Sequence, residues 1–110
     1  MKIVIGADHG GFELKAMLMA AFQECEDKGC FDPDACDYPD YAGPAAEAVA
    51  RGECERGILV CSSGIGVSIV ANKVPGIRAA VCSEPYSAKL TVQHNNANII
   101  AMGARVVGDE

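Results

Sequence analysis

Short apolar runs alternate along this chain with segments in which apolar residues recur every three or four positions. Runs of the first kind indicate buried strands, and recurrence near 3.6 residues indicates amphipathic helices. We expect strands at residues 2–7, 57–61, 77–82 and 97–102. We expect helices at about residues 14–25, 39–50, 65–72 and 84–94. Because right-handed crossovers join such alternating elements into a parallel sheet, the pattern predicts a Rossmann-like three-layer α/β/α fold with about four to five strands.

Two of these helices carry predictions about single side chains. On the helix at 65–72, Ile65, Ile69 and Val70 are expected to face the sheet. Ser83 is expected to cap the helix that follows it, because a serine hydroxyl can accept a hydrogen bond from the free amides of a first helical turn. Both predictions rest on local spacing alone.

The periodic pattern is interrupted at a few places. Residues 26–37 are polar, contain no β-branched residue and are punctuated by a glycine and a proline, so we predict a loop there. Pro44 obstructs the helix at 39–50 unless the helix begins at that residue, since proline lacks an N–H group. Gly52 is expected to end that helix.

Length and charge narrow the class of protein. The chain has 110 residues, which favours a single domain spanning residues 1–110. Its net charge of −6 argues against a nucleic-acid partner, which would favour a basic surface. No apolar stretch is long enough to span a membrane and no secretory leader is visible, so we expect a cytoplasmic protein that does not bind membranes.

Six cysteines raise the question of disulfides or a metal site. The α/β pattern and the absence of a visible leader disfavour a disulfide framework. No Cys-x-x-Cys pair occurs and the two histidines lie far apart in the sequence, which disfavours zinc. We therefore expect reduced thiols, most of them buried as small apolar side chains.

The strand at 57–61 ends in the most informative segment of the chain. Cys61, Ser62 and Ser63 place a thiol and two hydroxyls at a carboxyl end, and Gly64-Ile65-Gly66 follows. The glycines allow a tight turn whose free N–H groups can point at an anion, and open α/β sheets bind ligands at this edge. Cys61 could act as a base or be a core thiol. Ser63 could donate to an oxyanion, cap the next helix, or do both.

Further polar residues flank the other predicted strands. Asp8 and His9 follow the first strand and Arg105 follows the last, so all three belong to the same sheet edge. Each has a functional and a structural interpretation: hydroxyl binding or a helix cap for Asp8, phosphate binding or a structural histidine for His9, and a phosphate clamp or a surface ion pair for Arg105. His94 and Asn95 precede the last strand and therefore belong to the opposite end of the sheet. His94 could shuttle a proton or end a helix, where its charge is favourable.

In this order, these clusters resemble the ribose-5-phosphate isomerase B and galactose-6-phosphate isomerase (RpiB/LacA/LacB) family. The similar stretches span nearly the whole chain, at residues 3–15, 37–42, 56–61, 63–66, 71–73, 76–80, 94–95, 97–98 and 103–108. The resemblance implies an aldose–ketose isomerase that acts on a sugar phosphate without a metal or other cofactor. Ribose 5-phosphate and ribulose 5-phosphate are the expected pair.

The resemblance also implies roles for individual residues. The implied catalytic residues are Cys61, the base that moves a proton between C2 and C1 of the open-chain sugar, Ser63, which steadies the enediolate, and His94, which opens the furanose ring. The implied substrate-binding residues are Asp8, His9, Tyr41, Ser62, Gly64, Ile65, Gly66, Asn95 and Arg105. Family members form dimers or higher homo-oligomers whose sites take residues across the interface, which would bring His94 to the site.

The chain departs from the family pattern in two ways. Residues 26–36 stand where the family has an apolar second strand, so that strand is expected to be lost or malformed, which would open a sheet edge. The family's long C-terminal helix and its phosphate-binding arginines have no counterpart in this sequence. Ser62 also replaces a glycine common at that place.

Other functions are compatible with the same residues. A degenerate relative could bind a sugar phosphate without turning it over. A non-catalytic subunit could need a second, related chain, as in the two-subunit galactose-6-phosphate isomerases. A redox role for Cys61, or for the cysteines at 25, 30 and 36, is a further alternative. Pentose and hexose phosphates are not distinguished by the sequence.

Overall fold

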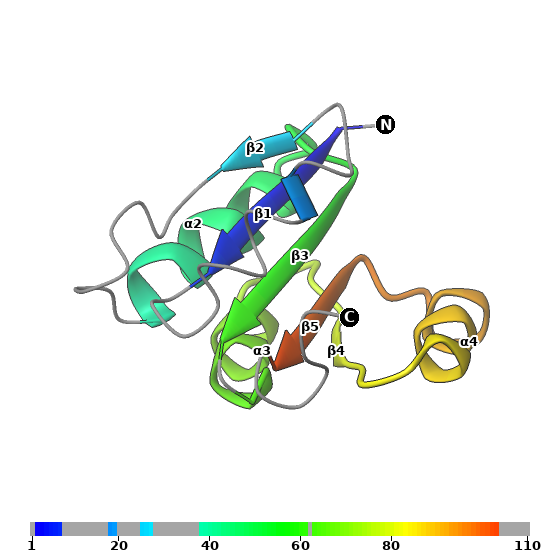
Figure 1. The fold of residues 1–110 in the computed structure, drawn as a ribbon. Helices are drawn as coiled ribbons and strands as arrows, with labels where there is room; N and C mark the ends of the chain where they lie inside the picture. Colours follow the sequence, from blue (N-terminus) through cyan, green and yellow to red (C-terminus); the bar gives the residue numbers. More distant parts are fainter. Residues whose placement is uncertain (1, 8–17, 20–24, 28–37, 62, 104–110) are drawn as a thin grey trace.

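The computed structural model of the chain describes residues 2–7, 18–19, 25–27, 38–61 and 63–103. In chain order the elements are β1 (Ile3–Ala7), β2 (Cys25–Asp27), α2 (Tyr38–Ala50), β3 (Arg56–Cys61), α3 (Ile65–Asn72), β4 (Ala79–Val81), α4 (Pro85–Asn95) and β5 (Ile99–Gly103). Figure 1 shows their arrangement. Of the first predicted helix, residues 18–19 are described and are helical, whereas Cys25 is described as part of β2.

The strands form one parallel sheet in the order β2-β1-β3-β5-β4. The central strand β3 pairs with β1 from Ile3↔Arg56 to Ala7↔Val60, and with β5 from Gly57↔Ile99 to Cys61↔Gly103. The Rossmann-like α/β prediction, with its parallel sheet, is confirmed.

The two faces of the sheet bury different side chains, because neighbouring residues on a strand point to opposite faces. Val4, Leu59 and Ile99 belong to the main core, which packs against α2 and α3. Val60 belongs to a smaller cluster on the other face, where Leu18 packs. Helical residues therefore cover both faces, as a three-layer fold requires.

Helix α2 begins at Tyr38, close to the predicted residue 39, and runs through Pro44, so the alternative that it begins at Pro44 is wrong. Pro44 is exposed, and the residues around it form an alanine-rich face buried against β1 and β3: Ala42, Ala45, Ala46, Ala48 and Val49. Burial of that face offsets the hydrogen bond that proline cannot make. The helix ends before Gly52, which adopts a φ of 80° as the sequence predicted for a helix stop.

Helix α3 has the predicted bounds but not the predicted orientation. Ile65 and Ile69 are 56% and 54% exposed, whereas Val67 and Ala71 are fully buried. Of the three residues expected to face the sheet, only Val70 packs against the core, and it is half-buried. The left-handed turn at Gly64 sets where the first helical residue points, and this rotates the buried stripe away from the positions that spacing alone suggested.

The cap of α4 is Glu84 rather than Ser83. The Glu84 carboxylate accepts a hydrogen bond from the Ser87 amide at 2.9 Å, and Pro85 occupies the first helical position. Hydrogen bonds from Ser87, from the side chain first and then the backbone, lower the pKa of the Glu84 carboxyl. Because Glu84 has an extended backbone directly before the proline, it takes the capping position, and Ser83 lies one residue too early.

Strand β2 corrects two predictions, because Cys25 was expected on a helix and residues 26–27 in a loop. Instead Cys25, Glu26 and Asp27 pair with Ile3, Val4 and Ile5 of β1. Parallel pairing supplies backbone hydrogen bonds that do not depend on apolar side chains. The second strand is therefore retained as a short edge strand, while the rest of the predicted loop, residues 28–37, lies outside the described residues.

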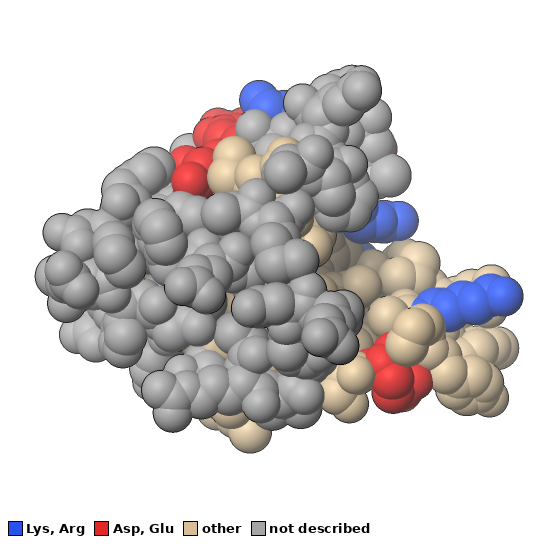
Figure 2. Space-filling model, in the orientation of Figure 1, with Lys and Arg blue, Asp and Glu red and all other residues tan. Residues whose placement is uncertain are grey.

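The remaining differences concern strand and helix boundaries. The strand predicted at 77–82 is shorter, covering Ala79–Val81, and the strand predicted at 97–102 covers Ile99–Gly103. Among the helices that the structure describes, none is long and apolar enough to cross a membrane. On the face drawn in Figure 2, the described Lys and Arg side chains lie apart from one another.

Candidate active site

The register of the sheet brings the carboxyl ends of β1, β3 and β5 to one edge. Ala7, the last residue of β1, pairs with Val60, and Cys61, the last residue of β3, pairs with Gly103 at the end of β5. The carboxyl ends of three adjacent strands therefore meet. The residues that directly follow these ends, Asp8, His9, Ser62 and Arg105, lie outside the described residues, so their proposed roles depend on this backbone placement.

Cys61 is the chemically distinctive group at this edge. Its side chain is only 5% exposed and belongs to the core cluster on the α2 and α3 face. The Gly64 backbone N–H donates a hydrogen bond to Cys61 Sγ at 3.0 Å. The thiol is thus both packed in the core and held by a backbone donor.

Gly64 fixes the turn that provides this donor. Its φ of 83° lies in the left-handed region, where a side chain is disfavoured. A Cβ at this position would lie 2.9 Å from the Met102 carbonyl carbon and 3.1 Å from the Gly103 nitrogen. The turn after β3 therefore lies directly against the backbone at the end of β5, and only glycine fits there.

Ser63 is exposed and lies one residue before Gly64, which occupies the N-cap position of α3, so the alternative that Ser63 caps this helix is wrong. Its Oγ accepts a hydrogen bond from the Ile65 amide at 3.2 Å, while Ser68 Oγ donates to the Ile65 carbonyl at 2.7 Å. Two amides of the predicted anion-binding turn thus already have acceptors, Gly64 in Cys61 Sγ and Ile65 in Ser63 Oγ. An oxyanion arriving here would share or replace these acceptors.

Tyr41 supports the strand that carries the thiol. It is 2% exposed, and its hydroxyl donates to the Val60 carbonyl at 3.1 Å, one residue before Cys61. Its ring also lies so close to Gly6 that a Cβ there would be 2.8 Å from a ring carbon. The tyrosine thus joins α2, β1 and the end of β3.

His94 and Asn95 lie away from Cys61 within one chain. They are exposed residues of the last turn of α4, which leads through residues 96–98 to Ile99. Ile99 pairs with Gly57 at the start of β3, while Cys61 lies at its end. The topological prediction that His94 belongs to the opposite end of the sheet is confirmed, and Figure 1 shows α4 well apart from the end of β3.

Two other described cysteines are less suited to thiolate chemistry. Burial and then a hydrogen bond with Glu26 raise the pKa of the Cys54 thiol, whose Sγ lies 3.5 Å from Glu26 Oε2. Burial and then the charge of Glu84 raise the pKa of the Cys82 thiol. Both are buried and free, as expected for small core thiols.

Sequence reasoning gave no role to a second polar cluster, at the amino-terminal end of the sheet. Asn72, Arg78 and Asn98 exchange hydrogen bonds there with neighbouring backbone. In the sequence, the polar residues placed just before two of the strands were the signal that could have revealed this cluster.

The fold and the residues at the carboxyl edge of the sheet together define a class of protein. A parallel sheet whose central strand ends in a buried thiol and a glycine turn is a Rossmann-like α/β protein, a class in which ligands bind at the carboxyl edge of the sheet.

Comparison with known proteins makes the assignment more specific. The sequence model of the family described as Ribose/Galactose Isomerase matches residues 3–110. The chain is 54% identical over 113 residues to ribose-5-phosphate isomerase B of Escherichia coli (strain K12), covering 99% of this chain and 76% of that protein. It is 45% identical over 117 residues to D-erythrulose-4-phosphate isomerase 2 of Mycolicibacterium smegmatis, covering 100% of this chain and 77% of that protein.

A solved structure supports the same family assignment. The structure of Clostridium thermocellum ribose-5-phosphate isomerase B superposes with a TM-score of 0.97 at 51% identity, covering 99% of this chain and 76% of that chain. The chain therefore belongs to the ribose/galactose isomerase family.

Proposed function

We propose that this chain is an aldose–ketose isomerase that interconverts ribose 5-phosphate and ribulose 5-phosphate. The observation that carries the proposal is the buried Cys61 thiol at the carboxyl end of the central strand, held by the Gly64 amide. It occurs in a chain 54% identical to a ribose-5-phosphate isomerase B. The second relative acts, by its name, on a tetrose phosphate, so we place the substrate in the class of short sugar phosphates.

Cys61 is the base in this proposal. In the forward direction the thiolate removes the proton from C2 of the open-chain aldose, and the electron pair moves onto O1, which gives an enediolate. A proton then passes from O2 to O1, the thiol returns its proton to C1, and the carbonyl has moved from C1 to C2. A proton next to a carbonyl is weakly acidic, so the base must lie within hydrogen-bond reach of both carbons.

The developing oxyanion needs donors, and Ser63 with the amides of residues 64–66 supplies them. The Gly64 and Ile65 amides are already oriented by Cys61 and Ser63, so little reorganisation is needed when an oxygen takes over. Losing one such donor typically costs on the order of 10²–10³ in turnover. Tyr41 lines the sugar pocket and Ser62, the residue after Cys61 in the sequence, binds substrate, while Asp8 binds hydroxyls and His9 and Arg105 bind phosphate.

Ring opening requires a second copy of the chain. His94, with Asn95 beside it, moves the proton that opens the furanose, but within one chain both residues lie at the far end of the sheet from Cys61. In a homodimer the end of α4 from one copy completes the site of the other. The enzyme works in the cytoplasm as a single-domain protomer and uses no cofactor.

A second candidate follows from the same separation of His94 from Cys61. The chain would then be a subunit that is inactive alone and needs a related, different chain to complete its site. Size measurement separates the two candidates: an active homodimer supports the first, and an inactive monomer that gains activity with a related chain supports the second.

The direct test is conversion of ribose 5-phosphate to ribulose 5-phosphate by the purified chain and by Cys61→Ala. Cys82→Ala is the matched control, since Cys82 is also a buried thiol at the end of a strand. We expect activity to disappear in Cys61→Ala and to persist in Cys82→Ala. Activity that survives in Cys61→Ala would refute the assignment of the base.

A further inference from the structure

Few packing contacts hold helix α4 against the rest of the described structure. It has no buried side chain, and in the part of the chain that the structure describes no other element packs extensively against it. A cavity of about 230 Å³ lies between it and the sheet, lined by Val92 of the helix and Ile58 and Ile100 of the strands among others. Because side-chain packing among the described residues does little to fix the helix, its position relative to them depends on the turns at its two ends.

The turn at its carboxyl end has a defined geometry. Asn96 adopts the left-handed conformation, with φ 54° and ψ 41°, and the next amide, of Ala97, donates to the Thr91 carbonyl at 3.1 Å. Asn96 is the described non-glycine residue with positive φ, a conformation that costs free energy unless its surroundings hold it. Something next to this turn must therefore stabilise it.

The Arg78 guanidinium lies at that position. Its Nε–H donates to the Asn96 carbonyl at 2.6 Å, and one terminal nitrogen lies 3.4 Å from the Gly76 carbonyl. Hydrogen bonds from a charged donor are about twice as strong as neutral ones. Within the described ranges no carboxylate pairs with Arg78, so this carbonyl is its principal partner.

Asn98 links the same two segments through hydrogen bonds to backbone groups. Its Oδ1 accepts from the Arg78 amide at 2.9 Å, its Nδ2 donates to the Gly76 carbonyl at 3.0 Å, and its own amide donates to the Arg78 carbonyl at 3.0 Å. On the other side, Asn72 holds both the amide and the carbonyl of Ala79, at 2.8 and 3.0 Å. The backbone that carries Arg78 is therefore rigidly placed against the sheet.

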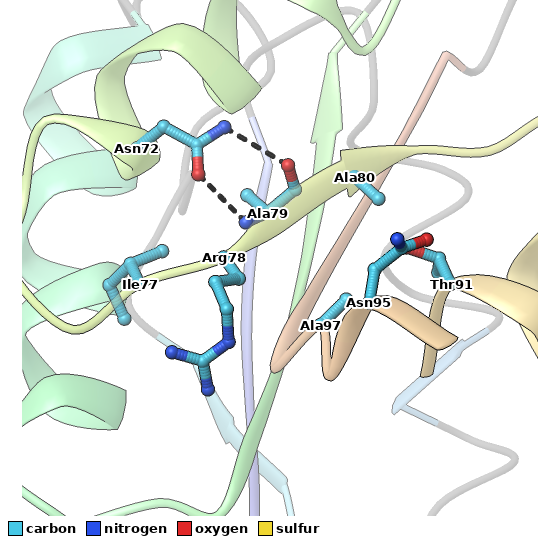
Figure 3. A pocket seen from close by; sticks show the side chains of 8 residues that line it. All are labelled: Asn72, Ile77, Arg78, Ala79, Ala80, Thr91, Asn95 and Ala97. Atoms are coloured by element: carbon cyan, nitrogen blue, oxygen red, sulfur yellow. Dashed lines mark hydrogen bonds between the residues drawn. The ribbon is translucent and has the colours of Figure 1, made fainter. Parts of the chain in front are cut away.

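Figure 3 shows the side chains that line a cavity beside this turn. Arg78, Thr91 and Asn95 line one cavity of about 270 Å³, with Asn95 and Thr91 on the last turns of α4. His94 precedes Asn95 on the same turn. A shift of the Asn96 turn would move both residues together.

We propose that Arg78 is a positioning residue: by binding the Asn96 carbonyl it holds the last turn of α4, and with it His94 and Asn95, where the sugar ring is opened. The inference rests on the proposed function for the role of His94. The clamp itself, meaning the bond from Arg78 to the Asn96 carbonyl that holds the turn, rests on the hydrogen bonds of Arg78 alone. Arg78 touches no reacting atom in this proposal and acts only through the turn.

The test separates ring opening from proton transfer. Conversion of ribose 5-phosphate needs an opened furanose. Exchange of the C1 hydrogen of ribulose 5-phosphate with deuterium from solvent, followed by NMR, needs only the base, because this ketose has its 5-hydroxyl phosphorylated and forms no ring. We compare Arg78→Ala with Arg51→Ala, whose guanidinium, among the described residues, bonds the exposed Glu53 and Glu47 side chains.

We expect Arg78→Ala to lower ribose 5-phosphate conversion by about tenfold to a hundredfold, the range that a misplaced group commonly costs. C1 exchange should stay within about threefold of the wild type, and Arg51→Ala should change neither rate. Equal losses in both assays would indicate a general structural role, and no loss in either would mean that Arg78 positions nothing; both outcomes overturn the proposal. If Arg78→Ala does not fold, the rates of ribose 5-phosphate conversion and of C1 exchange are compared in the same way for Arg78→Lys. This variant keeps the charge and the aliphatic stem but lacks the Nε donor.

A second readout does not depend on activity. Amide hydrogen exchange at Ala97, which is 2% exposed and bonded to Thr91, should accelerate in Arg78→Ala while the β3 amides keep their protection. Unchanged protection at Ala97 would overturn the clamp. If the wild-type chain shows neither ribose 5-phosphate conversion nor C1 exchange, the proposed function has failed, and the exchange result still decides whether Arg78 holds the turn.

Discussion

Gly64→Ala is the substitution whose cost can best be worked out from the structure. The turn at Gly64 places a backbone amide on the Cys61 sulfur and lies against the end of β5. Two separate costs follow from adding a methyl group. The first is conformational, because φ is 83°, and the left-handed region costs a residue with a Cβ roughly 1–2 kcal/mol. The second is steric.

The steric cost arises because the contacting atoms belong to backbone. The new Cβ would be 2.9 Å from the Met102 carbonyl carbon and 3.1 Å from the Gly103 nitrogen, and neither atom can move without displacing β5. Overpacking of this kind typically costs about 1–3 kcal/mol. Together the two costs give about 2–5 kcal/mol, a large part of the roughly 5–15 kcal/mol that stabilises a small domain.

Gly76→Ala is the matched control. Gly76 also has a positive φ, of 89°, but an added Cβ would meet no atom within 4 Å, so only the conformational cost applies. We expect Gly64→Ala to lower the free energy of unfolding by about 1–3 kcal/mol more than Gly76→Ala, as measured by urea denaturation. At about 4–8 °C per kcal/mol, thermal unfolding should show the same order.

Activity provides an independent check on the same variant. Displacing the Gly64 amide from Cys61 Sγ should reduce isomerisation even at temperatures where Gly64→Ala remains folded, whereas Gly76→Ala should keep its activity. If Gly64→Ala proved no less stable than Gly76→Ala, the inferred close approach of this turn to β5 would be wrong.

Two further predictions concern single hydrogen bonds. Tyr41→Phe removes the buried hydroxyl that donates to the β3 backbone, and should cost about 1–3 kcal/mol in urea denaturation, whereas Tyr86→Phe, at a residue 69% exposed, should cost nothing measurable. For Glu84 the pKa of the carboxyl is lowered in the folded state, so its stabilising effect is present above the unfolded pKa of about 4.3 and is lost as pH falls through the lower folded value. The wild type should therefore melt at a higher temperature than Glu84→Gln near neutral pH, and the difference should vanish in strong acid; a difference that persists in acid would contradict the capping role.

Much of the architecture could be predicted because it depends on local patterns. The apolar run that ends at Cys61 and the helix at residues 65–72 were found at or within one residue of their actual bounds. Both signals are strong, since a fully buried parallel strand is continuously apolar and a glycine turn marks where the helix begins. The opposite placement of Cys61 and His94 followed from topology in the same way.

The failures have a common cause in contacts between distant segments. Strand β2 exists because β1 offers backbone partners to Cys25–Asp27, and no apolar alternation announces it. Ile65 and Ile69 face away from the core because the Gly64 turn determines the rotation of α3. In neither case does the sequence near the residue contain the deciding interaction.

The sequence by itself determined the order of the strands and helices other than β2, the thiol and glycines at the end of the central strand, and the resemblance to sugar-phosphate isomerases. These depend on periodicity and residue type, which neighbouring positions carry. Only the tertiary structure decided that the Gly64 amide donates to Cys61, that the Tyr41 hydroxyl holds the end of β3, and that Arg78 binds the turn after α4. Those contacts depend on where the turn, the helices and the strands pack in space, and hydrogen bonds form only when donor and acceptor meet within narrow limits of distance and angle.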